Sequence, residues 1–363
     1  MRRGSALRRL IFHLHLYVGL SVGALLAIIG LTGSALVFAE ELDVWLNPHL
    51  HHAVPPTVGS LSLEEATQRA RRFHPAGRII YVRMPRAEDG TYEFWFDAND
   101  GLRVYVHPST GEIRGARVWR ESLVGRIYGL HSELLGGKRG ETALGICAAL
   151  LLLLGATGVV LWWPGGRRLS HALRINWSGN RKRVVYDLHN TVGFFASAFL
   201  IVSAITGLYL VFDAPFARAI NRLTASAPRS TPRALLSRPS LDDVLRAADQ
   251  ALPGAPTTYI GWPKDETAPF VVRKRFPAEL HPNGRSFVYV DQYDGEVLLV
   301  ENALRSPLGT RLVNLFYPIH IGLWGGLPTR ILQVLIGLTP AVLFITGLLM
   351  WRNRTRKRRS PVT

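Results

Sequence analysis

The chain has 363 residues, of which 48% are hydrophobic, and its formal net charge is +17. A single cysteine, Cys147, excludes an internal disulfide framework and any multi-cysteine metal site. A CxxCH motif is absent, which excludes covalently attached c-type haem.

Hydrophobic residues concentrate in four blocks, which predict four transmembrane helices at 16–38, 143–163, 191–212 and 331–351. Each block is long enough to cross an apolar layer of roughly 30 Å. The first block follows basic residues, so a cleaved signal peptide is the alternative interpretation. Because this block is longer than a signal h-region and residues 39–41 offer no clear cleavage site, we expect an uncleaved first span.

The charge is distributed in the way expected of a multi-pass membrane protein. The N-terminus, the loop at 165–188 and the tail at 352–363 hold 16 basic residues and one acid, Asp187. The rest of the chain is nearly balanced, with 27 basic and 25 acidic residues. The positive-inside rule therefore places these three segments in the cytoplasm. No basic folded domain is left to bind nucleic acid, so we expect no nucleic-acid partner.

The segments between spans one and two and between spans three and four predict small α+β domains. In the first, Ser62 and Glu65 form a capping-box pattern, and strands are expected at 78–82, 92–96 and 102–106, ended by a turn at 107–112. In the second, a helix is expected to begin after Ser240, with strands at 258–260, 270–272 and 286–290 and a matching turn at 291–296.

The predicted fold is thus an α-helical integral membrane protein with two α+β domains on the far side of the membrane. Its segments are a cytoplasmic N-terminus with the first span (1–39), a first domain (40–142), the second span (143–164), a basic loop (165–188), the third span (189–212), a second domain (213–330), the fourth span (331–351) and a basic tail (352–363).

An internal repeat relates the two halves of the chain. The series His15, Gly19, Thr32, Gly33, Phe38 recurs 174 residues later, as His189, Gly193, Thr206, Gly207, Phe212. The series His131, Gly136, Gly137, Thr157, Gly158, Trp162 recurs 189 residues later, as His320, Gly325, Gly326, Thr346, Gly347, Trp351. Two spans per repeat imply a parallel repeat with a pseudo-twofold axis along the membrane normal.

The repeated histidines are the candidate cofactor ligands. A twofold axis places His15 opposite His189 on the cytoplasmic side, and His131 opposite His320 on the other side. Facing imidazoles in a helical bundle suit a six-coordinate haem iron, and Gly19 or Gly193, one turn along, leaves room for a flat macrocycle. We therefore expect two b-type haems.

Other residues near these positions have weaker interpretations. His13 points away from His15 but is its natural substitute, Asp187 is either a partner of His189 or a helix cap, and the Thr-Gly pairs predict helix-packing contacts. The cluster His49, His51, His52 has spacing that could bind a transition metal, although a solvated loop is the commoner explanation.

These motifs resemble the PepSY-associated transmembrane family. The resemblance rests on His15-Leu-Tyr-Val-Gly19, Leu130-His131 with Gly136-Gly137, Asp187-Leu-His189 with Gly193, and Ile319-His320 with Gly325-Gly326, and the two soluble segments resemble PepSY domains. Similar members include di-haem ferric-siderophore reductases of the bacterial inner membrane. The resemblance implies two haem b groups, PepSY-like domains in the periplasm, and a ferric siderophore or other ferric chelate as substrate.

The electron donor is left open between quinol and a cytoplasmic flavoprotein. A non-redox alternative is a PepSY membrane protein that regulates a peptidase or acts as a sensor. A transporter is a third option, but the predicted spans lack the internal charged residues that usually mark a substrate path.

Overall fold

The computed structural model describes residues 6–53, 61–97, 101–164, 173–212, 229–231 and 239–359. Parts of the three predicted basic segments (residues 1–5, 165–172 and 360–363) lie outside the described residues. The chain divides into a helical unit (1–38, 127–217 and 319–363) and a sheet unit (39–126 and 218–318). Each unit is described by itself.

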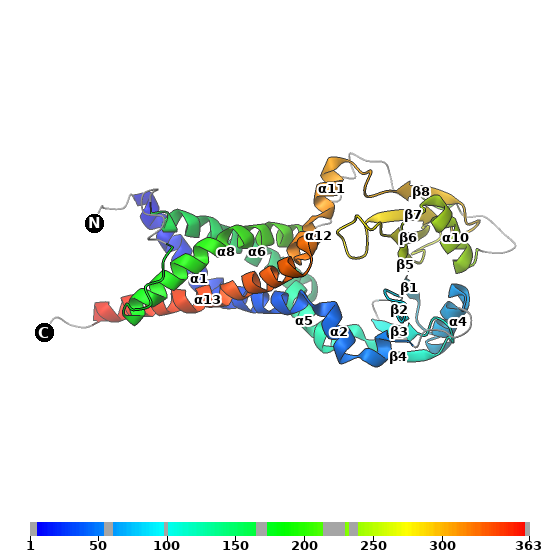
Figure 1. The fold of residues 1–363 in the computed structure, drawn as a ribbon, viewed down its shortest axis with the longest axis horizontal. Coiled ribbons are helices and arrows are strands. Elements are labelled where there is room, and N and C mark those ends of the chain that lie inside the picture. The colour runs from blue at the N-terminus through cyan, green and yellow to red at the C-terminus, as the bar shows by residue number, and fades with distance from the viewer. Residues whose placement is uncertain are drawn as a thin grey trace. The chain divides into compact units, whose positions relative to one another are not determined.

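The helical unit contains four long apolar helices, as the sequence predicts. They are α1 (Ala6–Leu36), α6 (Gly137–Trp162), α8 (Arg181–Val211) and α13 (Leu327–Arg359), and each is long and apolar enough to cross a membrane. All begin before the predicted spans, because polar and basic residues extend them beyond the apolar core. Helix α1 packs against α13 and α6 against α8 (Figure 1).

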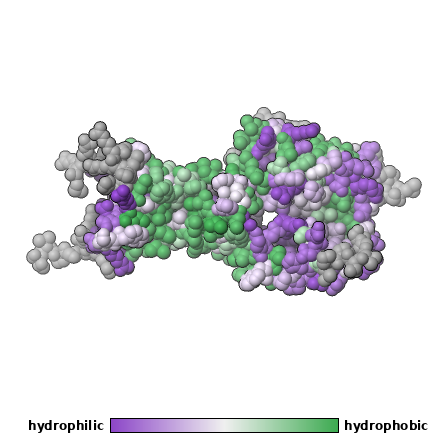
Figure 2. Space-filling view, viewed as in Figure 1, coloured by the Kyte–Doolittle hydropathy of each residue, from purple (hydrophilic) through white to green (hydrophobic). Residues whose placement is uncertain are grey.

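The surface of this bundle is that of a membrane protein. Outward-facing side chains such as Leu31, Ile146, Phe195 and Ile345 are about half exposed. Figure 2 shows hydrophobic residues around the bundle and hydrophilic residues at one of its ends. An apolar belt of this extent is stable only in contact with lipid, so the protein is a multi-pass membrane protein.

Two short helices carry the histidines that precede spans two and four. Helix α5 (Leu123–Glu133) ends just after His131, and α12 (Phe316–His320) ends at His320. Left-handed backbone follows each of them. After α5, Leu134, Leu135 and Gly137 have φ of +49°, +57° and +55°; after α12, Gly322 and Gly326, on either side of the 3-10 turn η3 (Leu323–Gly325), have φ of +76° and +69°. Glycine adopts these left-handed conformations without the steric cost of a Cβ atom.

The sheet unit contains one continuous antiparallel sheet of eight strands, in the order β4-β3-β2-β1-β5-β6-β7-β8 (Figure 1). The first segment supplies β1 (Ile79–Arg83), β2 (Tyr92–Phe96), β3 (Leu102–Val106) and β4 (Ile113–Val118). The second supplies β5 (Thr257–Gly261), β6 (Phe270–Lys274), β7 (Ser286–Val290) and β8 (Val297–Glu301). The strands of both predicted domains therefore belong to one sheet, joined where β1 pairs with β5.

Two equivalent helices cover one face of this sheet. Helices α4 (Leu63–Phe73) and α10 (Leu241–Ala251) both begin with a capping box, predicted at Ser62 and found also at Ser240, where only a helix start was predicted; their apolar faces share one core with the strands. Each helix also caps the other: Asp242 accepts from the backbone N–H of Leu63 at 2.9 Å, and Glu64 accepts from that of Leu241 at 3.1 Å. Carboxylates at helix N-termini satisfy free N–H groups and complement the helix dipole.

The remaining elements connect these parts. They are α2 (Ala39–Leu46), α3 (Pro48–His51), the 3-10 turn η1 (Trp119–Glu121) and α11 (Leu308–Asn314). The sequence does not predict strands β4 and β8. Both follow a turn that was expected to end its strand series, and Gly115 within β4 weakens the strand pattern there.

Candidate functional site

Each of the four repeated histidines contacts the threonine of a Thr-Gly pair on a neighbouring helix. The Nδ1–Oγ1 distances are 2.9 Å for His15 and Thr157, 2.9 Å for His189 and Thr346, 3.3 Å for His131 and Thr32, and 2.9 Å for His320 and Thr206. These contacts lie at the same offsets of 174 and 189 residues that relate the two halves of the sequence. The sequence predicts that the Thr-Gly pairs make helix-packing contacts. The structure shows that each threonine also contacts one of the repeated histidines.

The glycine of each pair lies against the same imidazole ring. An ideal Cβ atom would approach the histidine Cε1 to 2.7 Å at Gly33, 3.2 Å at Gly207, 3.3 Å at Gly158 and 3.4 Å at Gly347. A side chain at these positions would thus crowd or displace the ring. Threonine and glycine together hold the Nδ1–Cε1 edge of each histidine against the next helix.

The threonines also determine which ring nitrogen carries the proton. Each threonine hydroxyl donates to the carbonyl four residues before it, at 2.7 Å for Thr157 and Thr346 and 2.8 Å for Thr32 and Thr206. A hydroxyl has only one proton, so its oxygen must accept from the histidine. His131 Nδ1 additionally lies 3.0 Å from the carbonyl of Ile29, which can only accept.

All four imidazoles therefore carry the proton on Nδ1, and the Nε2 lone pair is free. No hydrogen bond joins these Nε2 atoms to any other residue that the structure describes. A histidine that donates one N–H to a fixed acceptor and leaves its other nitrogen free is the usual arrangement of a metal ligand. The donor set is thus four preorganised neutral imidazoles.

His131 and His320 come together as the sequence predicts. Their ring centroids are 6.2 Å apart, with an angle of 49° between the planes. The two rings are therefore close enough for both histidines to serve as ligands of one metal ion.

His15 and His189 line one cavity of about 660 Å³ inside the helical unit. Gly19 and Gly193 line it too, and the atoms nearest to an ideal Cβ at these glycines, from Leu154 and Leu343, are 3.8 and 3.5 Å away. Cavities of roughly 300–1,000 Å³ are typical of small-molecule and cofactor sites. The two predicted packing glycines therefore border open space beside the two histidines.

The cavity combines an apolar wall with a basic margin. Arg8, Arg9 and Arg354 line it, and the guanidinium of Arg8 donates to the carbonyl of Leu161 at 2.7 Å. Trp162 also lines the cavity, stacks on Phe194 at 3.8 Å, and has a buried Nε1–H without a hydrogen-bond partner among the described residues. The site fits a flat apolar ligand that carries acidic groups at one edge, as haem does.

The neighbouring candidates have other roles. His13 is exposed at the border of the same cavity and stacks on Tyr17 with centroids 6.0 Å apart, whereas His15 is the histidine held by Thr157. Asp187 is buried, but it pairs with Arg183 at 2.9 Å and accepts from the backbone N–H of Asn176 at 3.2 Å. It fixes the start of α8 rather than His189.

The His49, His51, His52 cluster is divided between different partners. His51 Nε2 lies 3.1 Å from Asp43, whereas His52 Nδ1 lies 2.7 Å from Asp89. Over the described ranges, no three His, Cys, Asp or Glu side chains gather to hold a metal ion. The predicted metal site gains no support from this arrangement.

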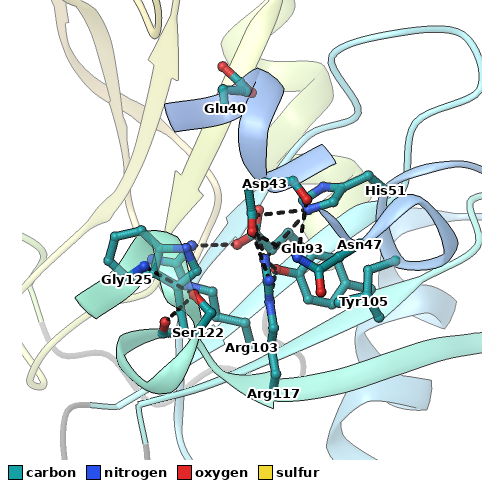
Figure 3. Close-up of polar contacts among 12 residues, drawn as sticks. Glu40, Asp43, Asn47, His51, Glu93, Arg103, Tyr105, Arg117, Ser122 and Gly125 are labelled. Carbon is teal, nitrogen blue, oxygen red and sulfur yellow. Dashed lines mark hydrogen bonds and ion pairs between the residues drawn. The ribbon is translucent and has the colours of Figure 1, made fainter. Parts of the chain in front are cut away.

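His51 instead belongs to a network of ion pairs and hydrogen bonds in the sheet unit (Figure 3). Asp43 accepts from Arg117 at 2.8 Å, and the buried Glu93 accepts from Arg103 at 2.9 Å and Arg83 at 3.2 Å. Burial raises the pKa of Asp43, but hydrogen bonds from His51 and Arg117 outweigh it and hold the pKa well below the usual range. Burial likewise raises the pKa of Glu93, and the charges of Arg103 and Arg83 lower it further than burial raises it.

Residues 12–354 match the family model described as the PepSY-associated TM region. The chain belongs to this family. The match covers all four long helices apart from their outermost residues, together with the sheet unit between them. The comparison with curated proteins gives no match.

Proposed function

We propose that this PepSY-associated protein carries two b-type haems, one between His15 and His189 and one between His131 and His320, and transfers electrons across the membrane. The observation that carries this proposal is the shared geometry of the four histidines. Each is fixed by a threonine and a glycine so that Nε2 is free and unprotonated. A structural histidine has no need of a free Nε2, whereas a ligand does.

When bound, haem supplies a one-electron couple whose potential depends on its axial ligands and surroundings. The protein's own residues would hold and orient it. The histidines supply the ligating nitrogens, Gly19 and Gly193 leave space beside them, and Arg8, Arg9 and Arg354 offer cations to acidic groups. Apolar helices keep water away and lower the local dielectric.

We further propose that the protein lies in the bacterial inner membrane with both termini in the cytoplasm and the sheet unit in the periplasm. The distribution of basic residues supports this orientation. Electrons would enter from quinol or a cytoplasmic flavoprotein and reduce Fe(III) to Fe(II) in a ferric siderophore or other ferric chelate. Fe(II) binds hard oxygen donors less tightly than Fe(III), so the reduction releases iron.

Transmembrane reduction can be measured in proteoliposomes that enclose a ferric chelate and an Fe(II)-specific dye. A membrane-impermeant reductant is added outside. We expect the dye to colour with the wild-type protein and not with His15→Ala. Equal colour in protein-free vesicles, or in both protein samples, would contradict the proposal.

A further inference from the structure

The hairpin between β6 and β7 gathers three arginines around one histidine. Arg273 and Arg275 lie at the end of β6, His281 lies in the connecting loop, and Arg285 directly precedes β7. We name these four residues the Arg–His cluster. His281 is 7% exposed, and its ring stacks on Tyr317 of α12 with centroids 5.0 Å apart. The ring is therefore fixed in place.

His281 is a neutral hydrogen-bond donor that has no acceptor among the residues that the structure describes. The backbone N–H of Asn283 donates to its Nδ1 at 3.2 Å, which leaves the ring proton on Nε2. Burial and the charges of Arg273, Arg285 and Arg275 lower the pKa of His281 to about 2, so the ring stays neutral. A guanidinium nitrogen of Arg273 lies 3.2 Å from Nδ1, to which it donates, and 3.4 Å from Nε2, to which it offers no acceptor.

The three arginines also lack anionic partners. No ion pair joins Arg273, Arg275 or Arg285 to a carboxylate within the part of the chain that the structure describes. The Nε atoms of Arg275 and Arg285 are buried and have no hydrogen-bond partner there. Leaving a buried donor unsatisfied costs about 1–3 kcal/mol, and more when the group is charged.

The nearby acid, Glu279, offsets only part of the charge of these three arginines. Glu279 is buried, and its carboxylate accepts from the backbone N–H groups of Phe276 and Arg285 and from the hydroxyl of Ser286. Its oxygens are thus engaged by neutral groups. Arg86, which donates to Asn283 at 2.6 Å, adds further positive charge and is paired with Glu40. Arg273 donates to the carbonyl of Gly284 at 2.9 Å and Arg275 to that of Glu279 at 3.4 Å, but no carboxylate among the described residues accepts from the three guanidinium groups.

We propose that the Arg–His cluster is a binding site for a carboxylate-bearing anion. Guanidinium groups match carboxylates with paired hydrogen bonds, and the Nε2–H of His281 adds a neutral donor. If the proposed function holds, on which this last step rests, the anion is the substrate's own chelator, a ferric polycarboxylate. Helix α12 contains both Tyr317, which stacks on His281, and the proposed haem ligand His320.

The test uses the full chain in nanodiscs of zwitterionic lipid. Isothermal titration calorimetry measures the binding of citrate, gallium(III) citrate and inorganic phosphate. Gallium(III) mimics Fe(III) but is not reduced, so binding is measured without turnover. We expect both citrate species to bind, and Arg275→Gln with Arg285→Gln to weaken binding by ~10–100-fold per arginine. The matched control is Arg72→Gln, an exposed arginine on α4, which should bind as the wild type does.

A second readout needs no variant. Citrate bound beside His281 should raise the pKa of this histidine in the wild-type protein, followed by NMR of isotope-labelled histidine. Absence of citrate binding, binding of phosphate alone, or citrate binding unchanged in the double variant would each refute the carboxylate site. The haem spectrum of the same sample separates the two proposals. Protein that contains haem but does not bind citrate refutes only the anion site. Protein that lacks haem but binds citrate refutes only the redox function.

Discussion

Replacing Thr157 by valine removes one hydrogen-bond acceptor while keeping nearly the same side-chain shape. The threonine is buried, and its oxygen accepts from His15 Nδ1–H at 2.9 Å. In Thr157→Val this N–H loses its partner, and the ring loses the contact that orients Nε2. The change therefore tests whether the Thr-Gly pair positions a ligand.

The expected changes in haem affinity and midpoint potential follow from the energy of this hydrogen bond. An unsatisfied buried donor costs about 1–3 kcal/mol, and loss of such a partner typically lowers metal affinity 10–100-fold. A hydrogen bond from Nδ1–H also makes the imidazole a stronger donor to Fe(III). Its removal should raise the midpoint potential, by ~40 mV for a difference of ~1 kcal/mol between the two oxidation states.

Haem affinity is measured by transfer to a haem-scavenging protein, and the potential by redox titration of the visible spectrum. Thr157→Ser, which keeps the hydroxyl, should restore both values. The control is Thr142→Val, an exposed threonine on the same helix whose hydroxyl also donates to a carbonyl in the preceding turn. Unchanged haem affinity and potential in Thr157→Val would refute the positioning role.

Three further predictions concern other parts of the protein. His131→Ala and His320→Ala should each remove one haem and spare the other, measured as haem per protein; equal loss of both would contradict the one-pair-per-haem assignment. Gly33→Ala should displace His131, because its Cβ would lie 2.7 Å from Cε1, and should lower haem content, whereas Gly309→Ala, which meets no atom within 4 Å, should not. The folded-state pKa values of Asp43 and Glu93 lie below their unfolded values of ~3.9 and ~4.3, so their stabilisation is present above about pH 4 and is lost as pH falls through the lower folded values. Thermal unfolding of Asp43→Asn should therefore depend less on pH in this acid range than that of the wild type, and an equal dependence would argue against the ionic network.

Much of the architecture follows from patterns that the sequence displays directly. The four long helices come from apolar blocks too long for a soluble core. The helix starts at Ser62 and Ser240 are local motifs, and six of the eight strands lie in short runs rich in β-branched and aromatic residues. These features depend on residues close together in the chain, which is why they could be predicted.

The features that could not be predicted from the sequence depend on contacts between segments that are far apart in the chain. The pairing of β1 with β5 joins Val82 to Ile260, and nothing local to either strand distinguishes one shared sheet from two. The contact of His15 with Thr157 likewise spans 142 residues. One signal could have revealed it, since Thr-Gly pairs recur with the same offsets as the histidines.

The Arg–His cluster also escaped sequence analysis. His281 is an ordinary loop histidine in the sequence, and only folding brings Arg273 into contact with its ring and the charge of Arg285 close to it. Basic and acidic residues are nearly equal in number over the chain outside the three predicted cytoplasmic segments, but they do not all pair in space. Charge counts therefore conceal a local excess.

The central claim is that four fixed histidines hold two haems. It is tested most directly by the visible spectrum of the purified protein, oxidised and dithionite-reduced, together with the number of haems per chain. The proposal predicts a low-spin b-type spectrum and two haems per chain, falling to one when His15 or His131 is replaced by alanine. A purified, folded protein without such a spectrum, even after haem is supplied, would contradict it.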